Sequence, residues 1–335
     1  MALLEVTDLT VTFSRRGRRD VNAVDGVSFA VDAGETLGLV GESGSGKSVT
    51  SLAIMGLLPR RGAKVGGEVL FEGRQLLTLR QDDLRDLRGK DIAMVFQDPL
   101  SSLNPVVPIG TQVTEVLTRH RGLKGPAARK EAADLLDLVG IPDPDRRLRE
   151  YPHQLSGGMR QRALIAMAVA CRPKVLIADE PTTALDVTIQ AQILELLKGL
   201  VREQGTAMML ITHDLGVVAG LCDRVNVMYS GRIVERADRR TLFVSPRHPY
   251  TAGLLGSIPR LDSVEGSPLR PIPGSPTDTL PWTSACAFAP RCPRALEVCR
   301  TVTPDLEPDG PRWLRCHNPV PAEEAAAIGA EGRRE

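Results

Sequence analysis

The sequence GESGSGKS at residues 41–48 decides the fold class of this 335-residue chain. It fits the pattern G-x-x-x-x-G-K-[ST], in which glycines let backbone N–H groups close around a polyphosphate. In this pattern Lys47 reaches the terminal phosphates and the Ser48 hydroxyl binds Mg²⁺. A helix that begins at the lysine directs its positive end at the anion. Residues 41–48 are therefore predicted to bind a nucleotide.

The residues around this loop predict strands that alternate with helices. Thr36–Val40 (TLGLV) predicts a buried strand before the loop, and Lys47–Leu58 predicts a helix after it. Other strands are predicted at Leu3–Phe13, Val27–Val31, Gly67–Phe71, Ile92–Phe96, Lys174–Ala178 and Ala207–Thr212, helices at Arg160–Cys171 and Ile189–Gln204, and a hairpin at Val225–Val234. The alternation predicts an α/β fold with a mostly parallel sheet covered on both faces.

Composition narrows the class of protein. The chain is 42% hydrophobic and 25% charged, which favours a soluble protein with a large core. Its formal net charge of +1 argues against a nucleic-acid partner held mainly by electrostatics. No apolar run approaches the ~18 residues of a membrane span, and the first ten residues lack a signal-peptide pattern. We expect a cytoplasmic protein.

A pair of carboxylates complements the phosphate-binding loop. Asp179 follows the apolar run VLIA and ends the strand predicted there, where it could hold Mg²⁺. Glu180, the next residue, could polarise a water molecule for attack on a γ-phosphate. The two residues predict nucleotide hydrolysis rather than binding alone.

The segment LSGGMRQR at residues 155–162 adds a second predicted anion site, because a serine and two glycines open a helix there. The order of the 41–48 loop, Gln97, LSGGMRQR, VLIADE and His213 resembles the nucleotide-binding subunits of ATP-binding cassette (ABC) transporters over about residues 3–235. The resemblance implies that two subunits enclose two ATP molecules, with the LSGG helix of one contacting the ATP bound by the other.

The resemblance also implies individual roles. Glu180 looks like the catalytic base, His213 the γ-phosphate sensor and Asp186 part of the loop that links the two sites. Residues implied to bind ATP are Phe13, Gly41, Ser43, Gly44, Ser45, Gly46, Lys47, Ser48 and Val49. Ser48, Gln97 and Asp179 are implied to bind Mg²⁺ or its water ligands. Ser156, Gly157, Gly158 and Gln161 are implied to contact the ATP held by the partner subunit. Lys47 and Gln97 are counted with the catalytic residues.

Phe13 is the candidate for stacking on adenine, because Phe29 falls within the strand that leads to the loop. Phe13 as ordinary strand packing is the alternative, since aromatic residues favour strands regardless of any ligand. The guanine-specifying pattern N-K-x-D is absent, which favours ATP.

The implied fold is a P-loop NTPase of the ABC cassette type, with antiparallel strands at its N-terminus. We expect an ATPase core at residues 1–97 and 160–240, and a helical insertion with the signature motif at 98–159. Helices are predicted there at Thr111–Arg119 and Ala127–Val139. A Cys-rich extension at 241–321 would contain a proline-rich connector at Pro259–Pro281, and 322–335 would be a disordered tail.

Several segments resemble the oligopeptide, dipeptide and nickel importer branch of the family. They are FQDP at residues 96–99 with SSLNP at 101–105, YPHQ at 151–154, HPYT at 248–251 and the cysteine segment. The resemblance implies a peptide importer at the cytoplasmic face of the membrane. Its implied partners are a second cassette, identical or different, two permeases and an extracytoplasmic solute-binding protein. The helical insertion would contact the permeases.

Four cysteines lie close together in sequence as C-x5-C-x6-C-x16-C: Cys286, Cys292, Cys299 and Cys316. Neither short gap fits the C-x2–4-C pairs of structural zinc, whereas [4Fe–4S] ligation tolerates irregular spacing. Some peptide-importer subunits hold such a cluster, although Ala285 stands where they more often have glycine. We predict a [4Fe–4S] cluster, with zinc (His317 as another ligand) and free thiols as alternatives. Cys171 and Cys222 are predicted to be buried and inert.

Three other functions remain open from the residues. The importer could carry nickel or another small solute, or the cysteine segment could be a redox module that controls the ATPase. A soluble ABC ATPase acting on nucleic acid is disfavoured, because the chain has no heptad repeats, no second P-loop and a near-neutral charge.

Overall fold

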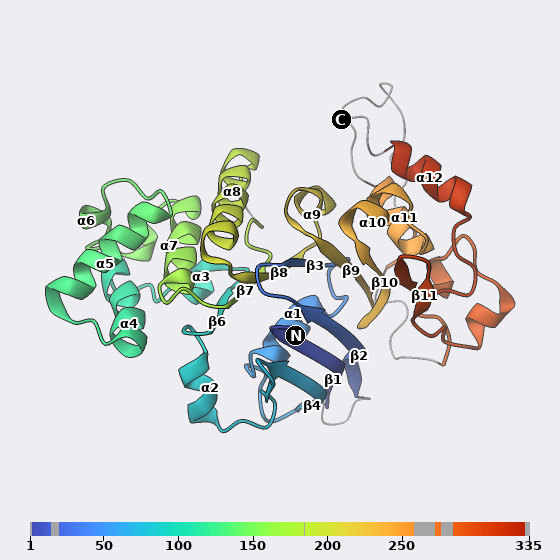
Figure 1. The fold of residues 1–335 in the computed structure, drawn as a ribbon, viewed down its shortest axis with the longest axis horizontal. Helices are drawn as coiled ribbons and strands as arrows, with labels where there is room; N and C mark the ends of the chain where they lie inside the picture. The colour runs from blue at the N-terminus through green and yellow to red at the C-terminus, as the bar shows by residue number, and fades with distance from the viewer. Residues whose placement is uncertain (1, 15–19, 184, 258–271, 276–283, 332–335) are drawn as a thin grey trace. The chain divides into compact units, whose positions relative to one another are not determined.

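The structure is a computed structural model that describes residues 2–14, 20–183, 185–257, 272–275 and 284–331. Two compact units make up the chain, and their elements are labelled in Figure 1. The first unit comprises Met1–Leu4, Val31–Thr36 and Phe71–Leu210; the second comprises Glu5–Ala30, Leu37–Leu70 and Ile211–Glu335.

The second unit contains the sheet that leads into the 41–48 loop. Its strands lie in the order β11 (Glu307–Asp309), β12 (Arg312–Leu314), β10 (Arg232–Asp238), β9 (Arg224–Tyr229) and β3 (Thr36–Val40). β3 and β9 are parallel, whereas the pairs β9–β10, β10–β12 and β11–β12 are antiparallel. The predicted hairpin is confirmed, with Ser230 and Gly231 at φ 46° and 73° in a two-residue turn.

Most of a second sheet, in the order β2 (Val21–Val31), β1 (Leu4–Phe13) and β4 (Ala63–Phe71), also belongs to the second unit. β1 buries alternate apolar residues, as its sequence predicts. β2 and β4 begin before the predicted Val27 and Gly67. Helix α1 (Lys47–Ile54) ends earlier than predicted, because Gly56 turns the backbone to φ 60°.

In the first unit, β6 (Ile92–Val95) runs parallel to β7 (Val175–Asp179), and β8 (Ala207–Thr212) adjoins β7. Every residue of β7 and β8 is buried, which explains their nearly continuous apolar sequences. The first unit also contains β5 (Arg74–Gln75), which is the last strand of the β2–β1–β4 sheet, and the helices α2 (Gln81–Leu87) and α8 (Val187–Gln204).

Between β6 and β7 the described chain forms helices and loops. They are α3 (Pro99–Ser102), α4 (Ile109–Arg121), α5 (Gly125–Leu138), α6 (Pro144–Arg147), the 3₁₀ turn η1 (Pro152–Gln154) and α7 (Gly157–Val169), coloured from cyan to yellow-green in Figure 1. α4 buries Ile109, Val113 and Leu117 at helical spacing. Helices are thus confirmed at both predicted places in the insertion.

The C-terminal part of the second unit contains α9 (Leu215–Leu221), α10 (Arg239–Val244), α11 (Pro249–Gly256), the 3₁₀ turns η3 (Ala289–Arg291) and η4 (Glu297–Arg300), and α12 (Ala322–Glu331). The prediction of a disordered tail is wrong for α12, because this Ala-rich segment has a high helix propensity and buries Ala325. At Gly329 the helix approaches Val244 too closely for any side chain. Residues 332–335 and most of the predicted connector lie outside the described residues.

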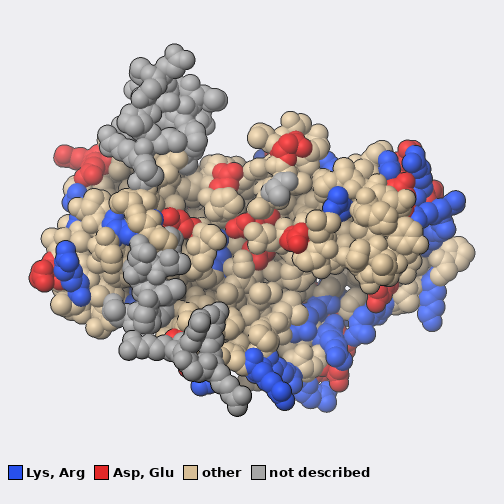
Figure 2. Space-filling model, turned by 180° about the vertical axis from the view of Figure 1, so that it is seen from behind, with Lys and Arg blue, Asp and Glu red and all other residues tan. Residues whose placement is uncertain are grey.

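No helix in the described part of the chain is long and apolar enough to cross a membrane. Figure 2 shows one face of the molecule, on which basic and acidic side chains both reach the surface between larger uncharged areas. This mixture agrees with the formal net charge of +1.

Candidate nucleotide-binding site

The loop at residues 41–48 joins β3 to α1 and is shaped by its glycines. Gly41 adopts φ 155° and Gly46 φ 102°, which side-chain-bearing residues rarely adopt. A Cβ at Gly41 would collide with the carbonyl oxygen of Met228, and one at Gly46 with that of Ala23. The loop therefore folds against the β9–β10 hairpin, and the amide of Gly231 donates to the carbonyl of Ser45 (2.7 Å).

Lys47 is buried within the loop that precedes it, with 4% of its surface exposed. Its Nζ donates to the carbonyl oxygens of Gly41 (2.8 Å) and Glu42 (2.9 Å). The ammonium is thereby held inside the concavity of the loop, at the start of α1. A positive charge and a helix N-terminus at one place make a phosphate site by elementary electrostatics.

The first unit brings Gln97 and Glu180, two predicted site residues, into direct contact. Gln97 Nε2 donates to Glu180 Oε2 at 2.8 Å. Thr183 Oγ1 donates to the same oxygen at 2.9 Å, a contact that sequence reasoning missed. Glu180 has φ 45°, a conformation that costs a non-glycine residue about 1–2 kcal/mol. A carboxylate held by two donors on strained backbone is typical of a functional position.

Asp179 ends β7 with 4% of its surface exposed, directly before Glu180. Its place at the carboxyl end of a parallel strand is where α/β sheets bind ligands. His213 follows β8 and is exposed, and Asp214 begins the next helix by accepting from the amide of Gly216 (2.8 Å). Phe13 is the last residue of β1 and is partly exposed; its stacking on adenine stays a prediction.

The LSGGMRQR segment at residues 155–162, the signature motif of the predicted cassette, contains the start of α7. Ser156 is the N-cap, and its Oγ accepts from the amide of Met159 (3.3 Å). Gly158 is needed because a Cβ there would lie 2.7 Å from Cγ2 of Ile189. Ser156 and Gly157 are exposed, whereas Gln161 is only 2% exposed. Burial of Gln161 favours packing in α7 over the predicted contact with a partner's ATP.

Asp186 is the N-cap of α8, where its Oδ1 accepts from the amide of Ile189 (2.9 Å). The neighbouring Val187 is 83% exposed, unusual for an apolar residue. The exposed signature residues and this exposed loop belong to adjacent parts of the first unit, since Ile189 of α8 lies against Gly158 of α7.

The four predicted metal-ligand cysteines line one small cavity with His248 and His317. Among the described residues, however, no group of three or more His, Cys, Asp or Glu side chains has metal-binding geometry. The donor set fits a Cys₄ site in chemistry, but the arrangement around a metal is not formed. His317 Nε2 is 3.2 Å from the carbonyl oxygen of Val302.

Burial dominates the titration of these thiols. It raises the pKa of Cys286 and Cys292, and with the other three thiols nearby it raises the pKa of Cys316 to about 12. Cys222 is fully buried, as predicted, and burial raises its pKa to about 12 as well. The prediction for Cys171 is only partly right, because that thiol is half-buried.

Known proteins with similar sequences identify the family of this chain. Residues 24–183 match the family model described as ABC transporter, and residues 234–299 match that described as oligopeptide/dipeptide transporter, C-terminal region. The "Oligopeptide transport ATP-binding protein OppD" of Salmonella typhimurium is 53% identical over 319 residues, which cover 95% of this chain and 94% of that protein. This chain belongs to the ABC transporter family.

Another relative of this ABC protein is the "Dipeptide transport ATP-binding protein DppD" of Bacillus subtilis, 55% identical over 303 residues, or 90% of each chain. Among solved structures, a dimeric bacterial ABC transporter cassette, MJ0796, matches with a TM-score of 0.63 and 31% identity. The match covers 70% of this chain and 98% of that cassette. The fold is therefore that of an ABC cassette, and the chain is an ABC-type ATPase.

Proposed function

We propose that this ATPase energises the import of dipeptides or oligopeptides across the cytoplasmic membrane. The observation that carries the proposal is the match of residues 234–299 to the C-terminal region of oligopeptide/dipeptide transporters, beyond the shared cassette. The relatives described as oligopeptide and dipeptide transport proteins support the same substrate class.

In the proposed cycle, ATP binding closes two cassettes and hydrolysis separates them. Lys47 and the amides of the 41–48 loop hold the terminal phosphates, and Glu180, oriented by Gln97 and Thr183, polarises the attacking water. Ser48, Gln97 and Asp179 are the proposed Mg²⁺ residues; the ion would neutralise charge that develops on the phosphates. His213 senses the γ-phosphate.

The proposed partners complete the transporter. The exposed N-terminus of α7, with Ser156 and Gly157, contacts ATP held by a second cassette, and Asp186 links the two sites. Two membrane permeases and an extracytoplasmic solute-binding protein supply the path and the substrate. The chain then acts at the cytoplasmic face of the membrane.

Transport measurements test the substrate class. The chain is reconstituted in lipid vesicles with the permeases, cassette and binding protein with which it co-purifies. We expect ATP-driven uptake of labelled dipeptides or oligopeptides, and ATPase activity stimulated by peptide-loaded binding protein. Uptake of nickel without peptide uptake, in the same vesicles, would contradict the proposal.

A [4Fe–4S] cluster held by Cys286, Cys292, Cys299 and Cys316 is a secondary proposal. It is supported by four thiols around one cavity, and it requires those thiols to move into ligating positions. Such a cluster would fasten the segment that contains the cysteines. Anaerobically purified protein should contain about four iron and four sulfide per chain; stoichiometric zinc, or no metal, would reject it.

A further inference from the structure

An arginine of the C-terminal extension contacts the nucleotide-binding loop. Arg291, the last residue of η3, donates from Nη1 to Glu42 Oε2 (2.7 Å) and from Nη2 to Glu42 Oε1 (2.9 Å). Glu42 is the second residue of the 41–48 loop. The two parallel hydrogen bonds form the strong, directional pairing of a guanidinium with a carboxylate. Only 3% of the Arg291 side chain is exposed, against 26% for Glu42.

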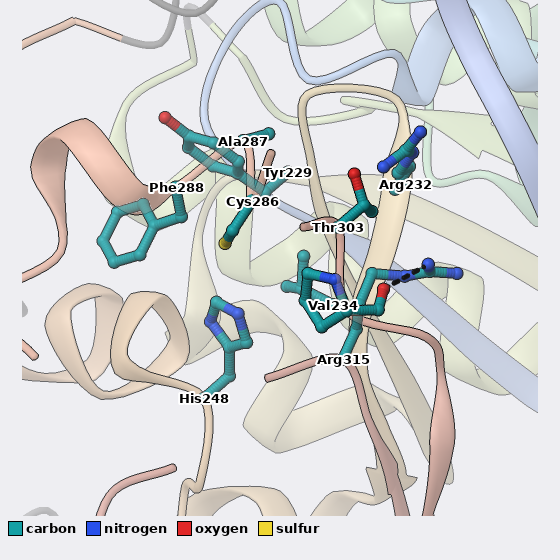
Figure 3. Close-up of a pocket in the computed structure, with 10 residues that line it drawn as sticks. Tyr229, Arg232, Val234, His248, Cys286, Ala287, Phe288, Thr303 and Arg315 are labelled. Carbon is teal, nitrogen blue, oxygen red and sulfur yellow. Dashed lines mark hydrogen bonds between the residues drawn. The ribbon is translucent and has the colours of Figure 1, made fainter. Parts of the chain in front are cut away.

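A second contact holds the backbone of the same loop residue. The amide of Glu42 donates to Oη of Tyr250 in α11 at 2.8 Å. The rings of Tyr229, Tyr250 and Phe288 pack together with centroids 4.7–5.4 Å apart. Figure 3 shows Phe288 of the extension and Tyr229 of β9 near Cys286. Arg291 is also fixed there, because its Nε donates to the carbonyl of Pro273 (2.7 Å).

These contacts act on a residue that shapes the phosphate site. The carbonyl of Glu42 accepts from Lys47 Nζ (2.9 Å) and from the amide of Ser45 (3.2 Å). Its amide, carbonyl and carboxylate are therefore all engaged. The carboxylate also adds a negative charge to a loop that must receive a polyphosphate, and two negative charges in one loop repel each other. Arg291 supplies the opposite charge.

We propose that Arg291 is a positioning residue for ATP, which acts through Glu42 on the shape and charge of the 41–48 loop. The C-terminal extension is then part of the ATP site of this subunit. The affinity of the cassette for ATP then depends on the presence of the extension.

The test replaces Arg291 by Met, of similar length but without charge. In the full-length purified subunit we expect the Kd for MgATP, from isothermal titration, to rise on the order of tenfold, the effect of losing a charged hydrogen bond. KM for ATP should rise in parallel, with kcat within about twofold. In the Arg291→Met background, Glu42→Gln should recover much of the affinity, because it removes the uncompensated charge.

Arg312→Met is the matched control. Arg312 also lies in the extension, is 7% exposed at its side chain and pairs with buried Glu235 at 3.1 Å. We expect Arg312→Met to lower Tm while the folded protein keeps its wild-type Kd for MgATP.

Three outcomes would overturn the proposal: wild-type affinity in Arg291→Met, no recovery on adding Glu42→Gln, or an equal loss of affinity in Arg312→Met. The last would mean that the extension affects ATP only through overall stability. Failure of the wild-type chain to bind ATP would instead contradict the ATPase assignment itself.

Discussion

Glu180 combines three features that suit a catalytic base: a strained backbone, a position directly after a buried strand, and two side-chain donors on one oxygen. The donors orient the carboxylate before any water arrives, so that little reorganisation is needed during reaction. Gln97 follows β6 by two residues and donates directly to Glu180 (2.8 Å), so a change at Glu180 is felt at the end of this strand.

Replacing Glu180 by Gln tests this role at the scale of one residue. Glutamine keeps an oxygen that accepts from Gln97 and Thr183, but it cannot take up a proton from water. We expect kcat for ATP hydrolysis to fall about 10²–10⁴-fold, with the Kd for ATP within about twofold of wild type. ATP should also stabilise the closed dimer, measured by size-exclusion chromatography.

Glu195→Gln is the control, because Glu195 lies exposed on α8 and forms an ion pair with Lys198 on the same helix (3.3 Å). It should leave kcat unchanged. Wild-type turnover in Glu180→Gln would remove Glu180 from the mechanism.

Single residues of the site were predictable where a short motif contains them. Gly41–Ser48, Asp179, Glu180 and Ser156 all lie in such motifs. The contact of Arg291 with Glu42 was not predictable, because the two residues are 249 positions apart and no local spacing links them. HPYT at residues 248–251 was noticed only as a resemblance, and the tertiary structure is needed to place the Tyr250 hydroxyl against the loop.

At the scale of elements, α11 depends on an unusual cap. Its N-cap is His248, whose Nδ1 accepts from the amide of Tyr250 (3.1 Å), so the ring must be neutral. Burial lowers the pKa of His248 to about 3, and the nearby positive charge of Arg315 acts in the same direction. Because the folded pKa lies below the unfolded value of about 6.5, acid favours the unfolded state.

His248→Asn tests this dependence, since asparagine can cap a helix but does not titrate. Between pH 7 and pH 5 the wild type should lose about 2 kcal/mol more unfolding free energy than the variant. The loss begins as pH falls through about 6.5 and would continue toward the folded pKa of about 3. Urea unfolding of both proteins at the two pH values measures it, and equal losses would contradict a buried neutral histidine.

Elements with strong periodicity were predicted well, as α4, α5 and the buried strands show. The incorrect predictions concern elements whose existence or end is set by tertiary contacts or by a turn. α12 forms where its composition suggested a frayed end, because it packs near Val244 and buries Ala325. α1 stops at Ile54 because of a glycine conformation that apolar periodicity does not reveal.

At the scale of the whole molecule, the exposed surfaces suggest that one chain holds incomplete sites. The N-terminus of α7 exposes Ser156 and Gly157, and the start of α8 exposes Val187. A helix start that exposes its cap and glycines is suited to an anion supplied by another molecule. The sequence motifs and the family resemblance imply the same arrangement.

Complementation between two inactive variants tests it directly. Lys47→Met removes the buried ammonium of the 41–48 loop, and Ser156→Arg places a bulky cation at the exposed start of α7. If each ATP is held between one chain's loop and another chain's α7, each variant alone has only defective sites. A mixed dimer then has one intact site, formed by the loop of the Ser156→Arg chain and the α7 of the Lys47→Met chain.

Equal mixing should make half of the dimers mixed, so ATPase activity should recover to about a quarter of wild type. The activity of each variant alone and of the mixture is measured at the same total chain concentration, high enough for dimerisation. Adding Glu180→Gln to the Ser156→Arg chain should abolish the recovery, because in that design this chain supplies the base of the intact site. Adding it to the Lys47→Met chain should not. Recovery with the opposite dependence, or none in a mixture that does dimerise, would mean that hydrolysis does not use a site shared in this way.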